Sequence, residues 1–224
     1  MNARDTVLAS IRHALGVTGT EAPRRKEVAD RLRDHPRGVI PQRGQRPDGE
    51  RIALCLEKIE AVAGTTQRIP AVSELPAAVA SYLRGNNLPL AVKRGTDPRL
   101  AAVHWEYEPA LSVSVGPSDG GDLAAISFAY GAAAETGTLV LLSGPDNPTT
   151  LNFLPDHHIV VVAAGSIAGD YESVLARLRE ERGADGLPRA VNLVTGPSRS
   201  ADIEQTLILG AHGPRRLHVI VLEG

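Results

Sequence analysis

The stretch IVVVAAGSIAGDYESVLARLREERGADGLPRAVNLV, residues 159–194, determines the class of fold. It begins with a short β-branched apolar run and ends with another, Val191–Val194, and such runs are typical of strands buried on both faces of a sheet. Between them, the spacing of the apolar residues predicts a helix from Asp170 to about Arg182, followed by Gly183. A strand, a helix and a strand in this order predict a right-handed β-α-β crossover in an α/β domain with a parallel sheet.

Helices and strands continue to alternate on both sides of this stretch. Helices are expected at residues 48–63 and 73–85, and each is followed by a short apolar strand. The strands expected from short apolar runs are Thr65–Ile69, Leu88–Val92, Leu111–Val115, Leu139–Leu142 and Leu217–Leu222. Successive units of this kind favour a layered α/β architecture.

The first 49 residues differ in character from the rest. Apolar residues at helical spacing predict an amphipathic helix over Asp5–Gly16. From Val17 to Gly49 this periodicity fails, and the segment is interpreted as an irregular arm with one short helix around 28–33. We therefore expect an N-terminal helix and irregular arm at residues 1–49 and an α/β domain at 50–224. The arm is either a solvated linker or a segment that packs on a partner subunit.

Composition and charge exclude several classes of function. A net charge of −2 and an aromatic content of 3% argue against nucleic-acid binding, which needs a basic excess or exposed rings. The single cysteine, Cys55, does not suffice for a disulfide, a structural zinc or an iron–sulfur cluster. The adjacent His157 and His158 point to opposite faces of a strand, so no metal site is predicted. The sequence shows no signal peptide and no apolar stretch of membrane-spanning length, so we expect a cytoplasmic protein.

Glycine–proline pairs mark the ends of several expected strands. Three of them, Gly116-Pro117, Gly144-Pro145 and Gly196-Pro197, directly follow such strands, and a fourth is Gly213-Pro214. Ligands in open α/β sheets bind beyond the carboxyl ends of the strands, so these turns indicate a ligand-binding edge. The alternative is that the pairs only terminate strands.

The densest polar cluster, TGPSRSADIEQ at residues 195–205, follows the expected strand 191–194. A glycine turn, hydroxyl groups and a helix start direct backbone N–H groups toward an anion, and an arginine adds a fork for carboxylate or phosphate. The ligand-binding candidates in this cluster are Gly196, Ser198, Arg199, Ser200, Asp202 and Glu204. Helix capping is the alternative, with Ser200 as N-cap and the two acids in the first turn. The sequence leaves both interpretations open.

Two further candidates could carry acid–base chemistry. Glu135, at the mouth of an expected strand, is a candidate nucleophile or general base, or else a carboxylate that accepts backbone hydrogen bonds in a tight turn. The ligand-binding candidates beside it are Thr136, Gly137 and Thr138. His212, followed by Gly213 as a further ligand-binding candidate, is a candidate catalytic acid or base, or else an exposed histidine without a function.

Three motifs together resemble a known family. They are AETGTL at residues 134–139, TGPSRSADIEQ at 195–205 and LGAHGPRRLH at 209–218. They resemble the lactate-utilisation (LUD) domain family over about residues 48–224, and the N-terminal helix resembles the start of LutC-type members. The resemblance implies a three-layer α/β domain of the NagB/RpiA/CoA-transferase-like kind with a mostly parallel sheet. It also implies a bacterial protein involved in the oxidation of lactate to pyruvate.

The resemblance implies that this chain is the cluster-free, LutC-type subunit and binds no cofactor itself. Iron–sulfur clusters would lie on partner lactate-utilisation subunits, while this chain binds a small carboxylate or phosphate ligand or organises the partners. The family supplies no established set of catalytic residues. Kinship of fold implies one alternative, a self-sufficient CoA-transferase-like or formyltetrahydrofolate cyclo-ligase-like enzyme that uses Glu135.

Overall fold

The computed structural model describes residues 2–183, 186–200 and 208–224. For Ser200, Ile208 and Leu209 it describes the backbone alone. The contacts divide the chain into two compact units, Met1–Ile40 and Pro41–Gly224. Each unit is described by itself.

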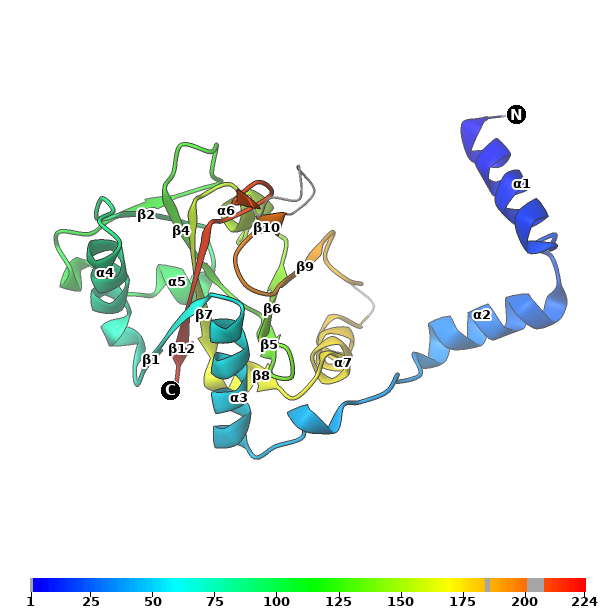
Figure 1. Ribbon diagram of the computed structural model, residues 1–224, viewed down its shortest axis with the longest axis horizontal. Helices are drawn as coiled ribbons and strands as arrows, with labels where there is room; N and C mark the ends of the chain where they lie inside the picture. The colour runs from blue at the N-terminus through cyan, green and yellow to red at the C-terminus, as the bar shows by residue number, and fades with distance from the viewer. Residues whose placement is uncertain (1, 184–185, 201–207) are drawn as a thin grey trace. The chain divides into compact units, whose positions relative to one another are not determined.

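The first unit consists of two helices, α1 (Ala3–Leu15) and α2 (Ala22–Asp34) (Figure 1). Helix α1 is the amphipathic helix expected from the sequence, and the side chain of Asn2 caps its start by accepting a hydrogen bond from the backbone of Asp5. Neither helix contains a buried residue. Helix α2 is longer than the short helix expected within the arm, because Pro23 lies in its first turn, where the fixed φ of proline favours a helix.

Two main sheets form the second unit. The first sheet has six parallel strands in the order β1-β12-β7-β4-β2-β3, and the second has four strands in the order β8-β5-β6-β9. The strands of the first sheet are β1 (Thr65–Ile69), β2 (Ala91–Arg94), β3 (Ser112–Val115), β4 (Ala124–Phe128), β7 (His157–Ala163) and β12 (Arg216–Leu222). Those of the second are β5 (Gly131–Ala133), β6 (Thr138–Leu142), β8 (Ile167–Ala168) and β9 (Val191–Val194). A short antiparallel pair consists of β10 (Arg199–Ser200) and β11 (Ile208–Leu209).

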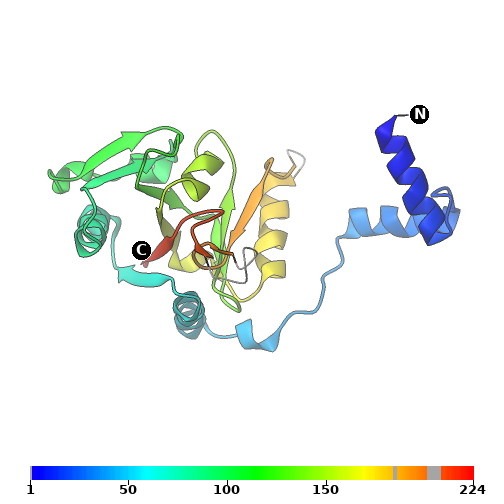
Figure 2. The same ribbon diagram turned by 45° about the horizontal axis from the view of Figure 1, so that its top comes forward.

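Helices cover both faces of the six-stranded sheet. The α-helices of this unit are α3 (Asp48–Ala61), α4 (Leu75–Gly85), α5 (Pro98–Ala101), α6 (Thr149–Phe153) and α7 (Tyr171–Arg182). The 3-10 turns are η1 (Gln42–Gly44), η2 (Val72–Glu74), η3 (Trp105–Tyr107) and η4 (Ala164–Ser166). Helices α4 and α5 pack on one face, whereas α3 and the second sheet enclose a separate apolar core on the other face. Helix α7 lies against β5 and β8, on the opposite side of the molecule from α4 (Figures 1 and 2).

This architecture confirms the expected layered α/β fold with a mostly parallel sheet. The third layer is mixed, because it contains the second sheet as well as helix α3. Among the helices of the described residues, none combines the length and the apolar character needed to cross a bilayer.

The β-α-β crossover expected from residues 159–194 is wrong. Strand β7 pairs with β4 and β12 in the first sheet, whereas β9 pairs antiparallel with β6 in the second. Strand β9 is only partly buried, and the side chain of Leu193 is 51% exposed. A strand with one solvent-exposed face is typical of the edge of an antiparallel sheet rather than of the interior of a parallel sheet. Helix α7 therefore connects two sheets instead of two neighbouring strands.

Strand β4 lies in the middle of the first sheet, and the sequence pattern missed it. All five of its residues, AAISF, are buried. Two alanines and a serine weaken the apolar run that would indicate a strand. The same small residues allow a helix to pack closely on the sheet at this strand. Strands β5 and β8 were missed as well, because they have three and two residues and consist of glycine, alanine and one isoleucine.

Two histidines are buried in the six-stranded sheet. His158 is fully buried, its Nε2 lies 3.1 Å from Ser127 Oγ, and burial lowers its pKa to about 3. His218 stacks on Tyr82 of α4 with ring centres 4.2 Å apart, and burial lowers its pKa to about 4. Both side chains are therefore neutral in the folded protein well below pH 6.5.

We expect the stability of the protein to fall as the pH drops below about 6.5. The unfolded chain binds protons on these histidines in that range and the folded chain does not. Between pH 7.5 and 5.5, each histidine should lower the free energy of unfolding by about 1.4 kcal/mol. Urea unfolding at both pH values checks this, with His158→Gln and His218→Gln each removing its share of the difference. The same pH difference in the wild type and in both variants would contradict the prediction.

Candidate functional site

The three sequence motifs meet in space. Strands β6 and β9 pair antiparallel, and this pairing brings Thr138 Oγ1 within 2.6 Å of Thr195 Oγ1. Ser198 then joins the second motif to the third: its backbone N–H donates to the carbonyl of Pro214 at 2.8 Å, and its carbonyl accepts from Gly210 N at 3.1 Å. The first candidate cluster and the described part of the second therefore form one continuous network.

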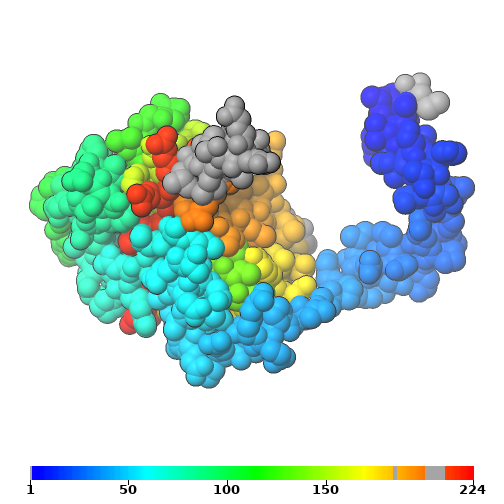
Figure 3. Space-filling view, viewed as in Figure 1, coloured from blue at the N-terminus to red at the C-terminus, as the bar shows by residue number. Residues whose placement is uncertain are grey.

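Helix α3 is the element on which this network packs. A Cβ atom at Gly137, which has a φ of 67°, would lie 2.7 Å from Ile59 N, and one at Gly196 would lie 2.7 Å from Val62 Cγ2. Residues 195–200 of the second motif (orange) border α3 (cyan) on the surface seen in Figure 3. The two glycines thus permit close approach of a helix, where the sequence interpretation placed a substrate.

Arg199 also contacts α3. Its Nη2 donates a hydrogen bond of 2.9 Å to the carbonyl oxygen of Val62, which is the C-cap residue of that helix. An arginine at this position satisfies a terminal carbonyl and interacts favourably with the negative end of the helix dipole. The guanidinium therefore caps the C-terminus of α3. The capping expected from the sequence concerned a different helix, one that starts near Ser200.

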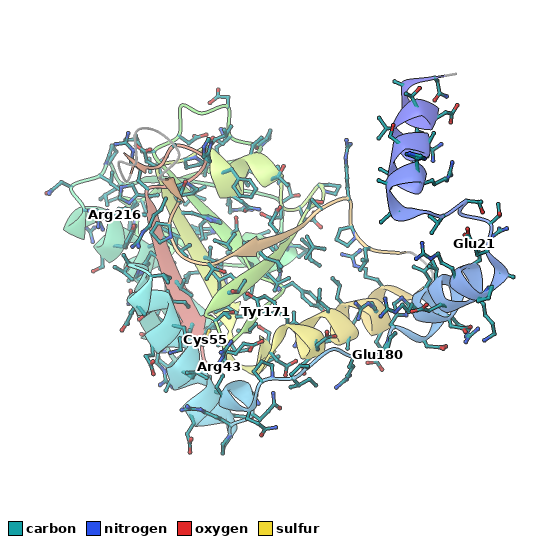
Figure 4. All side chains as sticks on the ribbon, turned by 45° about the vertical axis from the view of Figure 1, so that its right-hand side comes forward. Glu21, Arg43, Cys55, Tyr171, Glu180 and Arg216 are labelled. Atoms are coloured by element: carbon teal, nitrogen blue, oxygen red, sulfur yellow. The ribbon has the colours of Figure 1, made fainter. Side chains whose placement is uncertain are left out.

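Glu135 lies in the tight turn between β5 and β6 and is 5% exposed. Its Oε1 accepts a hydrogen bond of 3.4 Å from the backbone N–H of Tyr171, and its Oε2 accepts one of 3.3 Å from Arg43 Nη2. Arg43 and Tyr171 both lie near the start of α7 (Figure 4). The carboxylate joins the turn, the first turn of α7 and η1. This geometry supports the structural alternative for Glu135, and it favours neither a CoA-transferase-like nor a cyclo-ligase-like use of this residue.

Hydroxyl groups continue the network from Glu135. Tyr171 OH lies 2.6 Å from Thr138 Oγ1 and accepts a hydrogen bond of 3.0 Å from Thr136 Oγ1. The side chain of Thr138 is fully buried, so its hydroxyl serves protein partners. The polar residues of the first motif thus satisfy one another.

The remaining candidates divide into described and undescribed residues. His212 is exposed and its backbone N–H donates to Ser198 Oγ at 3.3 Å, and Gly213 packs beside Ser198. The backbone of Ser200 pairs with that of Ile208 in the antiparallel pair of β10 and β11. Asp202 and Glu204, with the helix start expected there, lie outside the described residues.

A different place in the fold carries an open cleft. Along the first sheet, the chain moves from β1 through β2 to β3 in one direction, and from β4 through β7 to β12 in the other. The order therefore reverses between β2 and β4, and ligands in open α/β sheets bind at the carboxyl ends of strands at such a switch point. A cleft of about 680 Å³ lies there, with walls from Asp97, Arg99, Phe128, Tyr130, residues 142–147, Ser166, Arg177, Glu181, Arg182 and Pro188.

Two arginines are held rigidly in this cleft. The guanidinium of Arg99 lies 4.0 Å above the ring of Phe128 and forms a bidentate pair with Asp97 at 3.0 and 2.6 Å. The guanidinium of Arg177 lies 4.8 Å from the ring centre of Tyr130, and its Nη2 donates to the carbonyl oxygens of Tyr130 and Ser166. Stacking on an aromatic ring and hydrogen bonds to protein acceptors fix the orientation of both guanidinium groups.

Tyr130 joins the second arginine to an acid of α7. Its hydroxyl donates a hydrogen bond of 2.8 Å to Glu181 Oε2. Burial raises the pKa of the Tyr130 phenol, and the bond to Glu181 raises it further. The phenol therefore stays protonated and remains a donor at neutral pH.

One of the four glycine–proline pairs lines this cleft, namely Gly144-Pro145. Gly116-Pro117 follows β3 at the carboxyl edge of the first sheet, whereas Gly196-Pro197 lies at the far end of β9, against α3. Gly213-Pro214 precedes β12 and so lies at the amino edge of the first sheet. The pairs therefore do not gather at one edge, because β6 and β9 belong to the second sheet.

Sequence reasoning missed the residues of the cleft. The contact of Arg177 with Tyr130 joins residues 47 positions apart, and no local motif links them. The one local signal is the Asp97-Pro98 turn after β2, and this pair is typical of a helix start rather than of a ligand site. In the described residues there is no group of three or more His, Cys, Asp and Glu side chains placed to hold a metal. Cys55 is buried, and burial raises the pKa of its thiol to about 12.

Comparisons with known proteins confirm the family indicated by the motifs. Residues 123–222, which include all three motifs, match the family model described as LUD domain. The C-terminal part of this chain, residues 123–222, is therefore similar to the LUD domain. In fold, it is similar to a DUF162 family protein from Deinococcus radiodurans, whose crystal structure gives a TM-score of 0.57 at 23% identity over 79% of this chain and 99% of that one.

The similar curated proteins include several named lactate utilization protein C. That of Halalkalibacterium halodurans is 37% identical over 99 residues, 44% of this chain and 43% of that protein. That of Geobacillus thermodenitrificans is 39% identical over 99 residues, 43% of this chain and 41% of that protein. The match thus spans about two fifths of each of these relatives. An uncharacterised protein of Neisseria meningitidis serogroup B is 32% identical over 65% of this chain and 64% of its own length.

We expect Glu135→Gln to destabilise the protein. The substitution removes the charge that Arg43 and the start of α7 neutralise in a buried site, which should cost about 1–3 kcal/mol of the free energy of unfolding. Urea unfolding measures this cost, with Glu57→Gln on the exposed face of α3 as the control. An unchanged free energy of unfolding in Glu135→Gln would contradict the structural role.

Proposed function

We propose that this chain is a cluster-free subunit of a bacterial lactate-oxidising system and contributes a ligand-binding cleft. The similarity to proteins named lactate utilization protein C supports a role in lactate utilisation. Its one cysteine is buried in the core and protonated at neutral pH, so this chain's thiol is a poor cluster ligand. The electrons would therefore pass through iron–sulfur clusters on partner subunits.

The cleft at the β2/β4 switch point is the site that we assign to this function. It is the observation that carries the proposal, because it combines the expected position in an α/β sheet with two arginines whose Nη1 groups remain as donors for a carboxylate or a phosphate. The three motifs lie at the other end of β6 from the cleft. They position this strand, and its last residue, Leu142, forms part of a wall of the cleft.

Growth on lactate tests whether the cleft is needed. In a host strain that lacks the gene, the wild-type chain should restore growth on lactate as the sole carbon source, and Arg99→Gln should not. Loss of one charge-assisted ligand contact costs about 1.5–3 kcal/mol of binding free energy.

Arg84→Gln is the matched control for this experiment. The side chain of Arg84 is 52% exposed and paired with Glu108, and that of Arg99 is 50% exposed and paired with Asp97. Arg84 lies on α4, outside the cleft, so this variant should restore growth. Immunoblots confirm equal protein levels, and all strains should grow on pyruvate. Full growth on lactate with Arg99→Gln would contradict the assignment of the cleft.

Isolation of the tagged protein under anaerobic conditions tests the assembly. From the host grown on lactate, we expect a brown eluate that contains cysteine-rich partner proteins and absorbs visible light as iron–sulfur clusters do. The same isolation from cells grown without lactate is the control for induction. A colourless, solitary protein from lactate-grown cells would contradict membership of an iron–sulfur assembly.

A further inference from the structure

The arginines of the cleft retain hydrogen-bond donors that the protein does not use. Within the described residues, Nη1 of Arg177 makes no hydrogen bond, and Nη1 of Arg99 makes only a long one of 3.4 Å to the carbonyl oxygen of Ala129. Arg182, in the last turn of α7, is exposed, and its side chain forms no hydrogen bond or ion pair with a described residue. Each guanidinium has five N–H donors and no acceptor, so the cleft has donors to spare.

The acids of the cleft are largely occupied by protein partners. Both oxygens of Asp97 accept hydrogen bonds from Arg99, and Oδ1 also accepts one from the backbone N–H of that residue. Glu181 accepts from the hydroxyl of Tyr130, and Asp146 accepts from Thr96 at 2.9 Å. A ligand therefore meets donors that need acceptors, rather than carboxylates that need donors.

The size of the cleft adds a second constraint. Pockets for cofactor-sized ligands commonly measure about 300–1,000 Å³, and the 680 Å³ found here lies in that range. Lactate has only six heavy atoms and one carboxylate, so it would engage one arginine and leave most of the cleft to water. Arg99 and Arg177 donate to the carbonyl oxygens of the neighbouring residues Ala129 and Tyr130, and both line the cleft. Their Nη1 groups are therefore the donors that remain for a ligand in the same space.

We propose that this cleft binds an organic oxyanion with at least two anionic groups and a size well above that of lactate. The anionic groups are phosphates or carboxylates, because both accept charge-assisted hydrogen bonds from guanidinium N–H groups. Arg99 and Arg177 each hold one group, and Arg182 at the rim adds a third cation. This inference deepens the proposed function of the same site. It places lactate itself elsewhere in the assembly.

Titration calorimetry of the purified full chain tests this ligand class. The probes are ADP and pyrophosphate as phosphate-bearing oxyanions, citrate as a carboxylate-bearing one, and lactate as the small acid. We expect ADP or citrate to bind at least 10-fold more tightly than lactate. If ADP binds more tightly than pyrophosphate, the organic part of the ligand contributes, and if citrate exceeds ADP, the anionic groups are carboxylates.

Two arginines in the last turn of α7 provide the matched variants. Arg182 lines the cleft and Arg179 is not among its lining residues, so Arg182→Ala should weaken binding of the best probe roughly 10-fold, and Arg179→Ala should leave it unchanged. Arg99→Lys keeps the charge but loses the planar guanidinium and its Nη1 donors, and it should weaken binding as well.

Three results would overturn the proposed ligand class: no binding of ADP, pyrophosphate and citrate, tighter binding of lactate than of all of them, or equal effects of Arg182→Ala and Arg179→Ala. The growth experiment distinguishes this failure from a failure of the proposed function. If Arg99→Gln abolishes growth on lactate while no multiply charged probe binds, the cleft is functional and the ligand class is wrong.

Discussion

The close packing of two glycine turns on helix α3 is the constraint on which the second sheet depends. Gly137 and Gly196 lie so near the backbone and side chains of Ile59 and Val62 that no side chain fits between them. Strands β6 and β9 are anchored there, and they project away from α3 toward the carboxyl edge of the first sheet. Strand β6 has five residues, so about 13 Å separates its anchored end from the end that enters the cleft.

The anchor also explains why a carboxylate is buried in a turn. A chain that reverses within four residues leaves backbone and side-chain groups that the apolar core cannot satisfy. Glu135 accepts from Arg43 and from the start of α7, and the hydroxyls of Thr136, Thr138 and Tyr171 satisfy one another. The two elements that flank the hairpin are thereby held in register with it. The same register places Arg177, six residues further along α7, against Tyr130.

The sequence predicted the elements better than their pairing. The runs that became β7 and β12 were recognisable because they are long, β-branched and buried on both faces. Strand β4 was not recognisable, because alanine and serine take the place of larger apolar residues in this fully buried strand. The connection through α7 joins two sheets, because the partly buried β9 pairs in the second sheet. The apolar pattern alone does not reveal that one face of β9 is exposed. The glycine motifs were located correctly, but the partner of each glycine is a helix that lies more than 70 residues away.

The motifs that indicate the family lie apart from the cleft to which we assign the ligand. The motifs that carry the resemblance lie at the α3 end of β6, and the arginines lie at the other end, on α5 and α7. Changes at Arg99 or Arg177 leave the packing of Gly137 and Gly196 on α3 untouched, because no contact joins the two sets directly. A chain can therefore keep the scaffold and all three motifs while the cleft adapts to a different ligand. In the function that we propose, the chemistry of the cleft side chains, rather than the motifs, determines what this chain binds.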